Sequence, residues 1–161
     1  MSRRPSVLVT AAACLATAAA VTAGGTAAAA APAAPPTVGT PCASATPGVR
    51  IDSLSFSPPS VPAGGASTVS LVATNCTDQV RTVSETWWGR FMSDSSTGIP
   101  AGCPAIDPLG RSVTFAPHER VVTSTSYFVF SGCTADRLRL TVTMAQDGVP
   151  PASRTADLLI G

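Results

Sequence analysis

The 161-residue sequence contains one histidine, no lysine and only 5% aromatic residues. With a single histidine, His118, and no Cys-x-x-Cys pair, it lacks the ligand spacing of a zinc site. His118 is expected in a solvent-exposed turn, within reach of Glu119 or Asp107. No serine lies in a Gly-x-Ser-x-Gly motif. The sequence therefore predicts no metal and no cofactor, and it argues against an enzyme. The carboxylates also follow no calcium-loop or catalytic-pair spacing; those considered are Asp52, Glu85, Asp94 and Asp107.

The charge is close to balanced. Ten basic residues face nine acidic ones, and all the basic residues are arginine. Loss of Arg3 and Arg4 with a leader leaves eight arginines against nine acids, and 8 − 9 gives a net charge of −1. Such a balance indicates neither nucleic acid nor an anionic membrane as a partner. Arginine without lysine, together with abundant alanine, is typical of a GC-rich bacterial genome.

Residues 1–31 have the pattern of a secretory signal peptide. Two arginines come first, an apolar run follows over residues 7–21, and Ala28 and Ala30 fit an A-x-A cleavage site before Ala31. A transmembrane helix is the alternative, because residues 7–34 hold no charge. However, alanine, glycine and threonine dominate this stretch, and prolines end it. We expect cleavage, a secreted, extracellular protein and no membrane span in the mature chain.

The remaining sequence predicts one all-β domain. Residues 32–48 are rich in Pro, Ala, Thr and Gly and are expected to form an extended lead-in, with a domain over residues 49–161. No window shows helical recurrence of apolar residues, whereas short segments alternate between apolar and polar. Seven strands at this spacing predict an antiparallel β-sandwich. They are residues 49–57, 67–75, 81–92, 111–115, 120–130, 137–145 and 153–160, with a long loop at 93–110.

Two stretches carry a resemblance to known modules. The sequence VPAGG at 61–65 leads into a strand that ends in ATN at 73–75, and FAPHER at 115–120 leads into another strand. This rhythm resembles bacterial immunoglobulin-like or fibronectin-III-like modules of the CARDB type. The resemblance covers most of residues 49–160 and implies an Ig-like sandwich in a secreted or surface protein, without implying a particular function. Cys76 and the long loop at 93–110 depart from the pattern.

Four cysteines lie beyond the leader: Cys42, Cys76, Cys103 and Cys133. Export makes them disulfide candidates. If seven strands alternate in direction, Cys42 and Cys76 lie at one end of the domain, and Cys103 and Cys133 lie at the other. We therefore favour the pairs Cys42–Cys76 and Cys103–Cys133 over the two other pairings, which the sequence leaves open. Each pair would close a loop of roughly 30 residues and stabilise the fold by about 3 kcal/mol.

Two adjacent tryptophans suggest a binding face. Trp87 and Trp88 must point to opposite sides of a strand, and the apolar pattern places Trp87 in the core. Trp88 then faces solvent beside Arg90, with Arg137 and Arg139 expected on the same face from a neighbouring strand. Such a group is a candidate binding platform. Its ligand would be an acidic peptide of a protein partner or a carbohydrate surface of the cell wall. The alternative is that the guanidiniums only cover the tryptophan.

The loop from Cys103 to Pro108 is a second candidate. It is proline-rich and, with Tyr127 to Cys133 downstream, is similar to the reactive-loop region of the subtilisin-inhibitor family. That resemblance covers about 30 residues and implies Ala105 and Ile106 as a scissile-like pair. A preorganised loop loses little entropy on docking to a protease. The alternative is a rigid surface loop.

Two further residues stand out. Glu85 falls on the inward face of its strand, which indicates either a bulge or a buried ion pair with Arg81 or Arg120. Asn75 begins an N-glycosylation sequon, but a disulfide at Cys76 would argue against its use.

Taken together, the sequence favours a secreted, non-catalytic binding or structural module. A secreted serine-protease inhibitor is the alternative, and an uncharacterised enzyme comes last.

Overall fold

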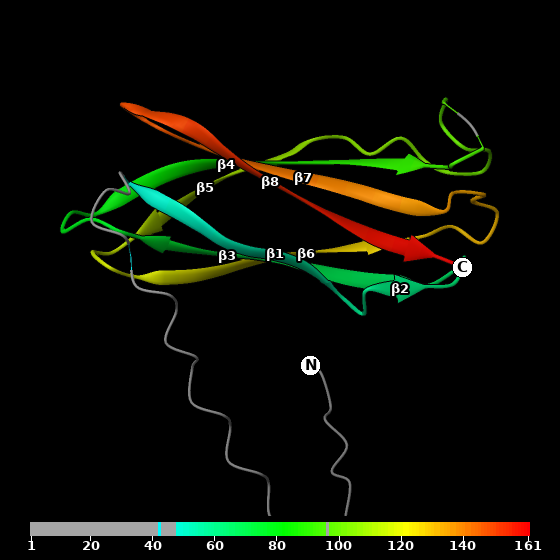
Figure 1. Cartoon of the computed structure of the whole chain (residues 1–161), viewed down its shortest axis with the longest axis horizontal. Coiled ribbons are helices and arrows are strands. Elements are labelled where there is room, and N and C mark those ends of the chain that lie inside the picture. Colours follow the sequence, from blue (N-terminus) through cyan, green and yellow to red (C-terminus); the bar gives the residue numbers. More distant parts are fainter. Residues whose placement is uncertain (1–41, 43–47, 96) are drawn as a thin grey trace, which may run out of the picture. The chain divides into compact units, whose positions relative to one another are not determined.

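The computed structural model describes residue 42, residues 48–95 and residues 97–161. The predicted signal peptide and most of the predicted lead-in lie outside this part of the chain. The described residues form eight strands and no helix, which confirms the all-β class (Figure 1). Each of the seven expected strands is present. The strands are β1 (Val49–Ser57), β2 (Ser60–Val61), β3 (Ala66–Asn75), β4 (Arg81–Met92), β5 (Leu109–Phe115), β6 (Arg120–Phe128), β7 (Arg137–Gln146) and β8 (Val149–Ile160).

The strands build two sheets. One has the order β1-β3-β6 and the other the order β2-β8-β7-β4-β5. All neighbouring strands are antiparallel except the two-residue β2, which runs parallel to β8. In Figure 1 the three-stranded sheet lies below β4, β5, β7 and β8. The long strands β4 and β7 pair along nine consecutive residues and form the centre of the five-stranded sheet.

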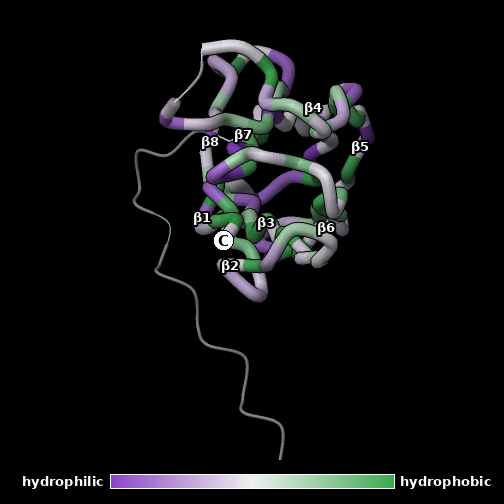
Figure 2. The backbone as a smooth tube through the Cα atoms, turned by 90° about the vertical axis from the view of Figure 1, so that its right-hand side faces the viewer, coloured by the Kyte–Doolittle hydropathy of each residue, from purple (hydrophilic) through white to green (hydrophobic). Residues whose placement is uncertain are grey.

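Alternation along each strand produces a single core between the sheets. Leu138, Leu140, Val142 and Met144 of β7 are all fully buried, as their spacing predicted. They belong to the same apolar cluster as Val69, Leu71 and Ala73 of the other sheet. Burial of each Val, Leu or Met side chain contributes roughly 1.5–3 kcal/mol. In Figure 2 hydrophobic and hydrophilic residues alternate along the strands.

The hairpin between β7 and β8 is longer than the sequence predicted. β8 begins at Val149, before two prolines that hide its strand character in the sequence. Asp147 and Gly148 form the two-residue turn, where Gly148 has a φ of 72°. Pro150 and Pro151 fit because β8 pairs with β2 only at its far end, so this stretch is a sheet edge, where a missing N–H is tolerated.

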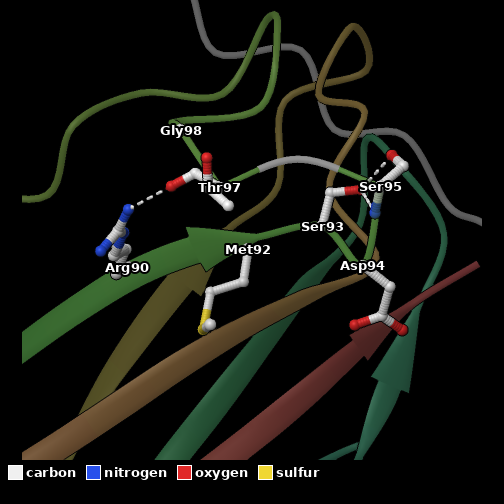
Figure 3. A pocket seen from close by; sticks show the side chains of 7 residues that line it. All are labelled: Arg90, Met92, Ser93, Asp94, Ser95, Thr97 and Gly98. Carbon is white, nitrogen blue, oxygen red and sulfur yellow. Dashed lines mark hydrogen bonds between the residues drawn. The ribbon is translucent and has the colours of Figure 1, made fainter.

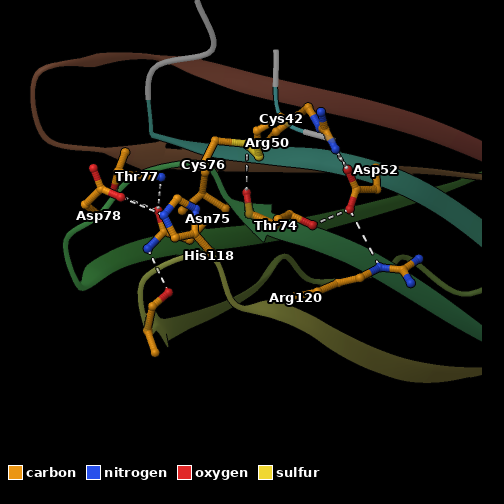
Figure 4. The surroundings of a disulfide bond; sticks show 12 residues. Cys42, Arg50, Asp52, Thr74, Asn75, Cys76, Thr77, Asp78, His118 and Arg120 are labelled. Atoms are coloured by element: carbon orange, nitrogen blue, oxygen red, sulfur yellow. Dashed lines mark hydrogen bonds and ion pairs between the residues drawn. A yellow bond between two sulfur atoms is a disulfide. The ribbon is translucent and has the colours of Figure 1, made fainter. Parts of the chain in front are cut away.

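Both predicted disulfides are present. Cys42 pairs with Cys76, and Cys103 pairs with Cys133, with Cα–Cα distances of 5.5 Å and 4.3 Å. The Cys42–Cys76 bridge ties the start of the described chain to the segment after β3 (Figure 4). The other bridge ties the long β4–β5 loop to the segment after β6.

Candidate functional site

The two tryptophans lie on opposite faces of β4, as predicted. Trp87 is fully buried, whereas 50% of the surface of Trp88 is exposed. Register across the sheet places Trp88 opposite Thr141 of β7, which in turn lies opposite Thr155 of β8. Trp88 therefore stands on the outer face of the five-stranded sheet, in a row with two threonines.

The arginines predicted beside Trp88 share this outer face. Arg90 lies directly opposite Arg139 in the pairing of β4 with β7, and Met92 lies opposite Arg137. Arg139 makes a two-point contact with Asp157 of β8, with Nε–Oδ1 and Nη2–Oδ2 distances of 2.9 Å and 2.8 Å. The hydrogen bonds from Arg139 lower the pKa of Asp157 below its usual value, and Asp157 in turn raises the pKa of Arg139.

The other two arginines bind the loop that follows β4. Arg137 Nη2 lies 2.8 Å from Asp94 Oδ1. Arg90 Nη2 donates to the carbonyl oxygen of Thr97 at 3.1 Å. The part of the chain that the structure describes shows an arginine stacked on Trp87 and none stacked on Trp88. The three guanidiniums are therefore held by oxygen acceptors at the side of the tryptophan.

A pocket of about 490 Å³ adjoins this face at its Arg90 end (Figure 3). Two of its lining residues are held by Asp136, whose carboxylate accepts hydrogen bonds from the Ser93 hydroxyl at 2.8 Å and the Asp94 backbone N–H at 2.7 Å. These two bonds, first the backbone one, lower the pKa of Asp136 despite a small opposing effect of burial. The lining residues are Arg90, Met92, Ser93, Asp94, Ser95, Thr97 and Gly98.

Hydroxyl groups form cross-strand pairs on this face. Thr141 and Thr155 lie within hydrogen-bond distance, with their Oγ1 atoms 3.0 Å apart, and Thr143 and Ser153 lie 2.8 Å apart. A similar pair across β4 and β5 joins two further threonines at 3.0 Å. Because cross-strand Thr–Thr and Thr–Ser pairs hold their rotamers, the hydroxyls form fixed rows beside Trp88.

Glu85 is fully buried, but its ion-pair partner differs from the prediction. Arg111 of β5 donates from Nε to Glu85 Oε2 at 2.9 Å, in place of Arg81 or Arg120. The indole N–H of Trp87 and the hydroxyl of Thr123 donate to the same carboxylate at 3.0 Å each. Arg111 also lies over the Trp87 ring, 4.4 Å from its centroid. Part of this signal was in the sequence, because alternation with the buried Phe115 points Arg111 inward; the pairing of β4 with β5 then places it directly opposite Glu85.

The two residues of the predicted inhibitor loop differ in exposure. Ala105 is exposed, whereas Ile106 is half-buried and packs against the core. A Cβ atom at Gly89 would meet Ile106 Cδ1 at 3.0 Å, so the isoleucine lies directly over this glycine of β4. Beyond Trp87, β4 has no partner in β5, and Ile106 helps to cover its inner side there.

His118 and the sequon have structural partners. His118 Nε2 lies 2.7 Å from Asp78 Oδ1, so its partner is neither Glu119 nor Asp107 (Figure 4). Both groups are largely exposed, which agrees with the solvent position predicted for the histidine.

Asn75 is fully buried, and its amide nitrogen donates to the carbonyls of Gln79 and Ala116 at 2.7 Å and 2.9 Å. The folded domain therefore leaves no room for a glycan on this side chain.

Within the described residues, no group of three or more His, Cys, Asp or Glu side chains is placed to hold a metal ion. The same part of the chain contains no helix with the length and apolar character needed to cross a membrane.

No protein-family model matches the sequence, and no curated protein matches it. Among solved structures, the chain is similar to the sporulation control protein Spo0M of Bacillus subtilis, with 9% identity and a TM-score of 0.47 over 70% of this chain and 49% of that one. It is also similar to the alkylpurine DNA glycosylase AlkC of Pseudomonas fluorescens bound to DNA containing an abasic site analog, with 11% identity and a TM-score of 0.45 over 69% and 30% of the two chains. A beta-glucosidase from Listeria innocua in complex with isofagomine follows, with 11% identity and a TM-score of 0.37 over 70% and 16%. The chain spans about half or less of each, and none of these likenesses carries a functional argument.

Proposed function

We propose that this protein is a secreted, non-catalytic binding module that uses the outer face of the five-stranded sheet around Trp88. The observation that carries the proposal is the half-exposed indole of Trp88 among arginines that are engaged elsewhere. Tryptophan and arginine are the residue types most enriched where binding energy concentrates. A large rigid side chain at the centre of an ordered face binds with little loss of rotamer freedom.

An immunoglobulin-like sandwich is the fold proposed for the module. The sheet order β1-β3-β6 and β8-β7-β4-β5 supports it, because antiparallel sheets of three and four long strands with crossing connections are typical of that architecture. The single apolar core, to which both sheets contribute side chains, supports this fold as well. Neither disulfide joins the centres of the two sheets, so this module differs from antibody domains in how it is cross-linked.

Secretion is supported by two independent features. The leader pattern of residues 1–31 is one, and the two disulfides are the other, because disulfides form and persist in oxidising compartments. A protein partner or a cell-wall carbohydrate surface is the kind of target that such a module would meet outside the cell.

Retention of the full chain on bacterial cell-wall material and on immobilised acidic peptide tests the proposal. We expect Trp88→Ala to lower retention on one of these supports by about tenfold or more. Val122→Ala is the matched control, because Val122 is 60% exposed and lies in the other sheet. Equal retention of Trp88→Ala and the wild type on every support would refute the proposal.

A protease inhibitor is the second candidate. The Cys103–Cys133 bridge favours it, because the tethered loop that the hypothesis needs depends on this bridge. The half-buried position of Ile106 disfavours it, because only Ala105 of the proposed pair is presented to solvent. Stoichiometric inhibition of a subtilisin-like protease that Ile106→Pro abolishes would replace the binding-module proposal with this one.

A further inference from the structure

We infer that the ligand of the Trp88 face is a neutral polysaccharide chain. This inference rests on the proposed function and deepens it, because it chooses between the two ligand classes that a tryptophan–arginine face suggests. Three observations carry it: the charge balance of the face, the rows of hydroxyls beside Trp88, and the position of the adjoining pocket.

The charges of the face and its immediate surroundings cancel. Arg90, Arg137 and Arg139 contribute three positive charges, and Asp94 and Asp157 contribute two negative ones, so 3 − 2 leaves +1 on the face itself. The exposed carboxylate of Asp136, which binds the Ser93 hydroxyl and the Asp94 backbone next to the face, brings the sum to zero. Arg139 and Arg137 already bind carboxylates at 2.8 Å. An acidic peptide would have to displace these carboxylates or approach them against like-charge repulsion. A ligand without net charge faces neither cost.

The polar groups of the face suit hydroxyls better than they suit carboxylates. A hydroxyl both donates and accepts, whereas an ionised carboxylate only accepts. The Arg139–Asp157 pair offers donors and acceptors side by side on neighbouring strands. Next to it, Thr141 and Thr155 add a fixed pair of hydroxyls in the same row as Trp88. A sugar ring lying on this surface can satisfy groups of both kinds.

Trp88 supplies the apolar part of such a contact. A pyranose ring carries C–H groups on its faces and hydroxyls at its rim, so it can lie flat on an indole while its rim meets the polar rows. Trp88 and Arg90 are two residues apart on one strand, which places them roughly 7 Å from each other along the face. The pocket beyond Arg90 adds the hydroxyls of Ser93, Ser95 and Thr97 (Figure 3). The contact surface is thus longer than one sugar ring and fits a chain of several.

Depletion binding with the full chain tests the inference. The probes are microcrystalline cellulose, chitin and insoluble mannan as neutral polysaccharides, with immobilised poly-glutamate as the acidic alternative. We expect at least one neutral polysaccharide to retain the wild type, and Trp88→Ala to lose this retention by about tenfold or more. Asp157→Asn should also weaken it, because this change unbalances the charge and removes an acceptor. Val122→Ala should bind as the wild type does.

Salt separates the two ligand classes further. Binding to a neutral polysaccharide should change little between about 0.05 M and about 1 M NaCl, whereas binding to poly-glutamate should weaken strongly. If Trp88-dependent, salt-sensitive binding occurs to poly-glutamate alone, the polysaccharide inference is wrong and the binding module stands. If no probe and no cell-wall material distinguishes Trp88→Ala from the wild type, both are wrong.

Folding of the variants can be followed independently of binding. Trp87 is fully buried and remains in every variant, so its fluorescence reports an intact core. Trp88→Phe offers a milder change that keeps an aromatic surface. It should retain part of the binding to the polysaccharide, and complete loss at unchanged Trp87 emission would contradict stacking as the contact.

Discussion

At the scale of the residue, the buried carboxylate of Glu85 is the most demanding group in the fold. An isolated charge inside a protein is very costly, and such groups persist only when they are paired and hydrogen-bonded. Glu85 receives one ion pair and two neutral hydrogen bonds, from Arg111, Trp87 and Thr123. Arg111 also donates to the Ser124 carbonyl at 3.2 Å, so the cluster links β4 and β5 to β6 of the other sheet. This cluster therefore fixes how the two sheets meet along that edge.

We predict that Glu85→Ala lowers the free energy of unfolding by about 3 kcal/mol or more, because it leaves a partly buried guanidinium and two donors without their acceptor. Glu85→Gln keeps the shape and an acceptor oxygen and should cost less. Urea unfolding followed by Trp87 fluorescence measures both. Glu119→Gln is the control, since Glu119 is exposed and its carboxylate accepts one backbone hydrogen bond from Ala116. Equal loss in Glu85→Ala and Glu119→Gln would show that the cluster does not stabilise the fold.

Residue positions were predictable from the sequence where a simple alternation decided them. Trp87 and Trp88 had to point to opposite faces, and Leu138 to Met144 had to point inward. The partner of Glu85 was not predicted, because it depends on which strand lies beside β4. Register alone brings Arg111 opposite Glu85, and register between strands is a property of the pairing, beyond any one strand.

At the scale of the element, the loop between β4 and β5 is held in place from two sides. Ile106 packs over Gly89 of β4, and the Cys103–Cys133 bridge ties the loop to the segment after β6. The close approach of the two segments depends on Gly102, which has a φ of 69°. A Cβ atom on this residue would overlap the carbonyl oxygen of Gly132. Only glycine allows the two backbones to come this near.

We predict that Gly102→Ala destabilises the domain by about 2 kcal/mol or more and slows formation of the Cys103–Cys133 bridge, because both the backbone conformation and the space exclude a methyl group. Gly132→Ala is a matched control: its Cβ would meet nothing within 4 Å. Thermal unfolding and non-reducing peptide mapping of the two variants measure the effect. If Gly132→Ala lost as much stability as Gly102→Ala, the steric explanation would be wrong.

Strand ends were predicted less well than strands, for physical reasons that differ between the cases. The start of β8 was missed because prolines at a free sheet edge look like a loop in the sequence. The two-residue β2 was missed because its strand character comes only from pairing with the end of β8. Such short elements have no pattern of their own.

At the scale of the whole molecule, the pairing of the four cysteines follows from the directions of the strands. Alternating strand directions bring Cys42 to Cys76 and Cys103 to Cys133, and this simple count favoured both pairs over the two other pairings that the sequence left open. The order of strands within the two sheets was beyond such a count, because it requires the chain to cross from one sheet to the other after β1, β2, β3, β5 and β6. The candidate face was predictable for the same reason as the disulfides: neighbouring long strands present alternate residues to solvent.

The dependence of stability on pH belongs to this scale, because carboxylates and a tyrosine far apart in the fold determine it together. The backbone N–H of Asp94 and the Ser93 hydroxyl lower the pKa of Asp136, and hydrogen bonds from Arg139 lower that of Asp157, both below the usual 3.8. A lowered pKa in the folded state adds stability above the usual value, and this stability disappears as the pH falls through the folded value. Burial raises the pKa of the Tyr127 hydroxyl above 10.0, against a smaller opposing effect of Arg111. Its contribution is therefore complete below 10.0 and declines as the pH rises beyond it.

We therefore predict a free energy of unfolding that is nearly constant between about pH 5 and about pH 9 and that falls on both sides of this range. Urea unfolding across the pH range, after alkylation of any free thiol, measures it. Asp157→Asn should flatten the acid limb while leaving the alkaline limb unchanged, because the Asp157 carboxylate titrates only on the acid side. Tyr127→Phe should do the reverse, because it removes the hydroxyl whose ionisation burial opposes. If the free energy of unfolding fell equally steeply at alkaline pH in Tyr127→Phe and in the wild type, Tyr127 would not control stability there. A shallower fall in Tyr127→Phe would assign the alkaline loss of stability to the Tyr127 hydroxyl of β6.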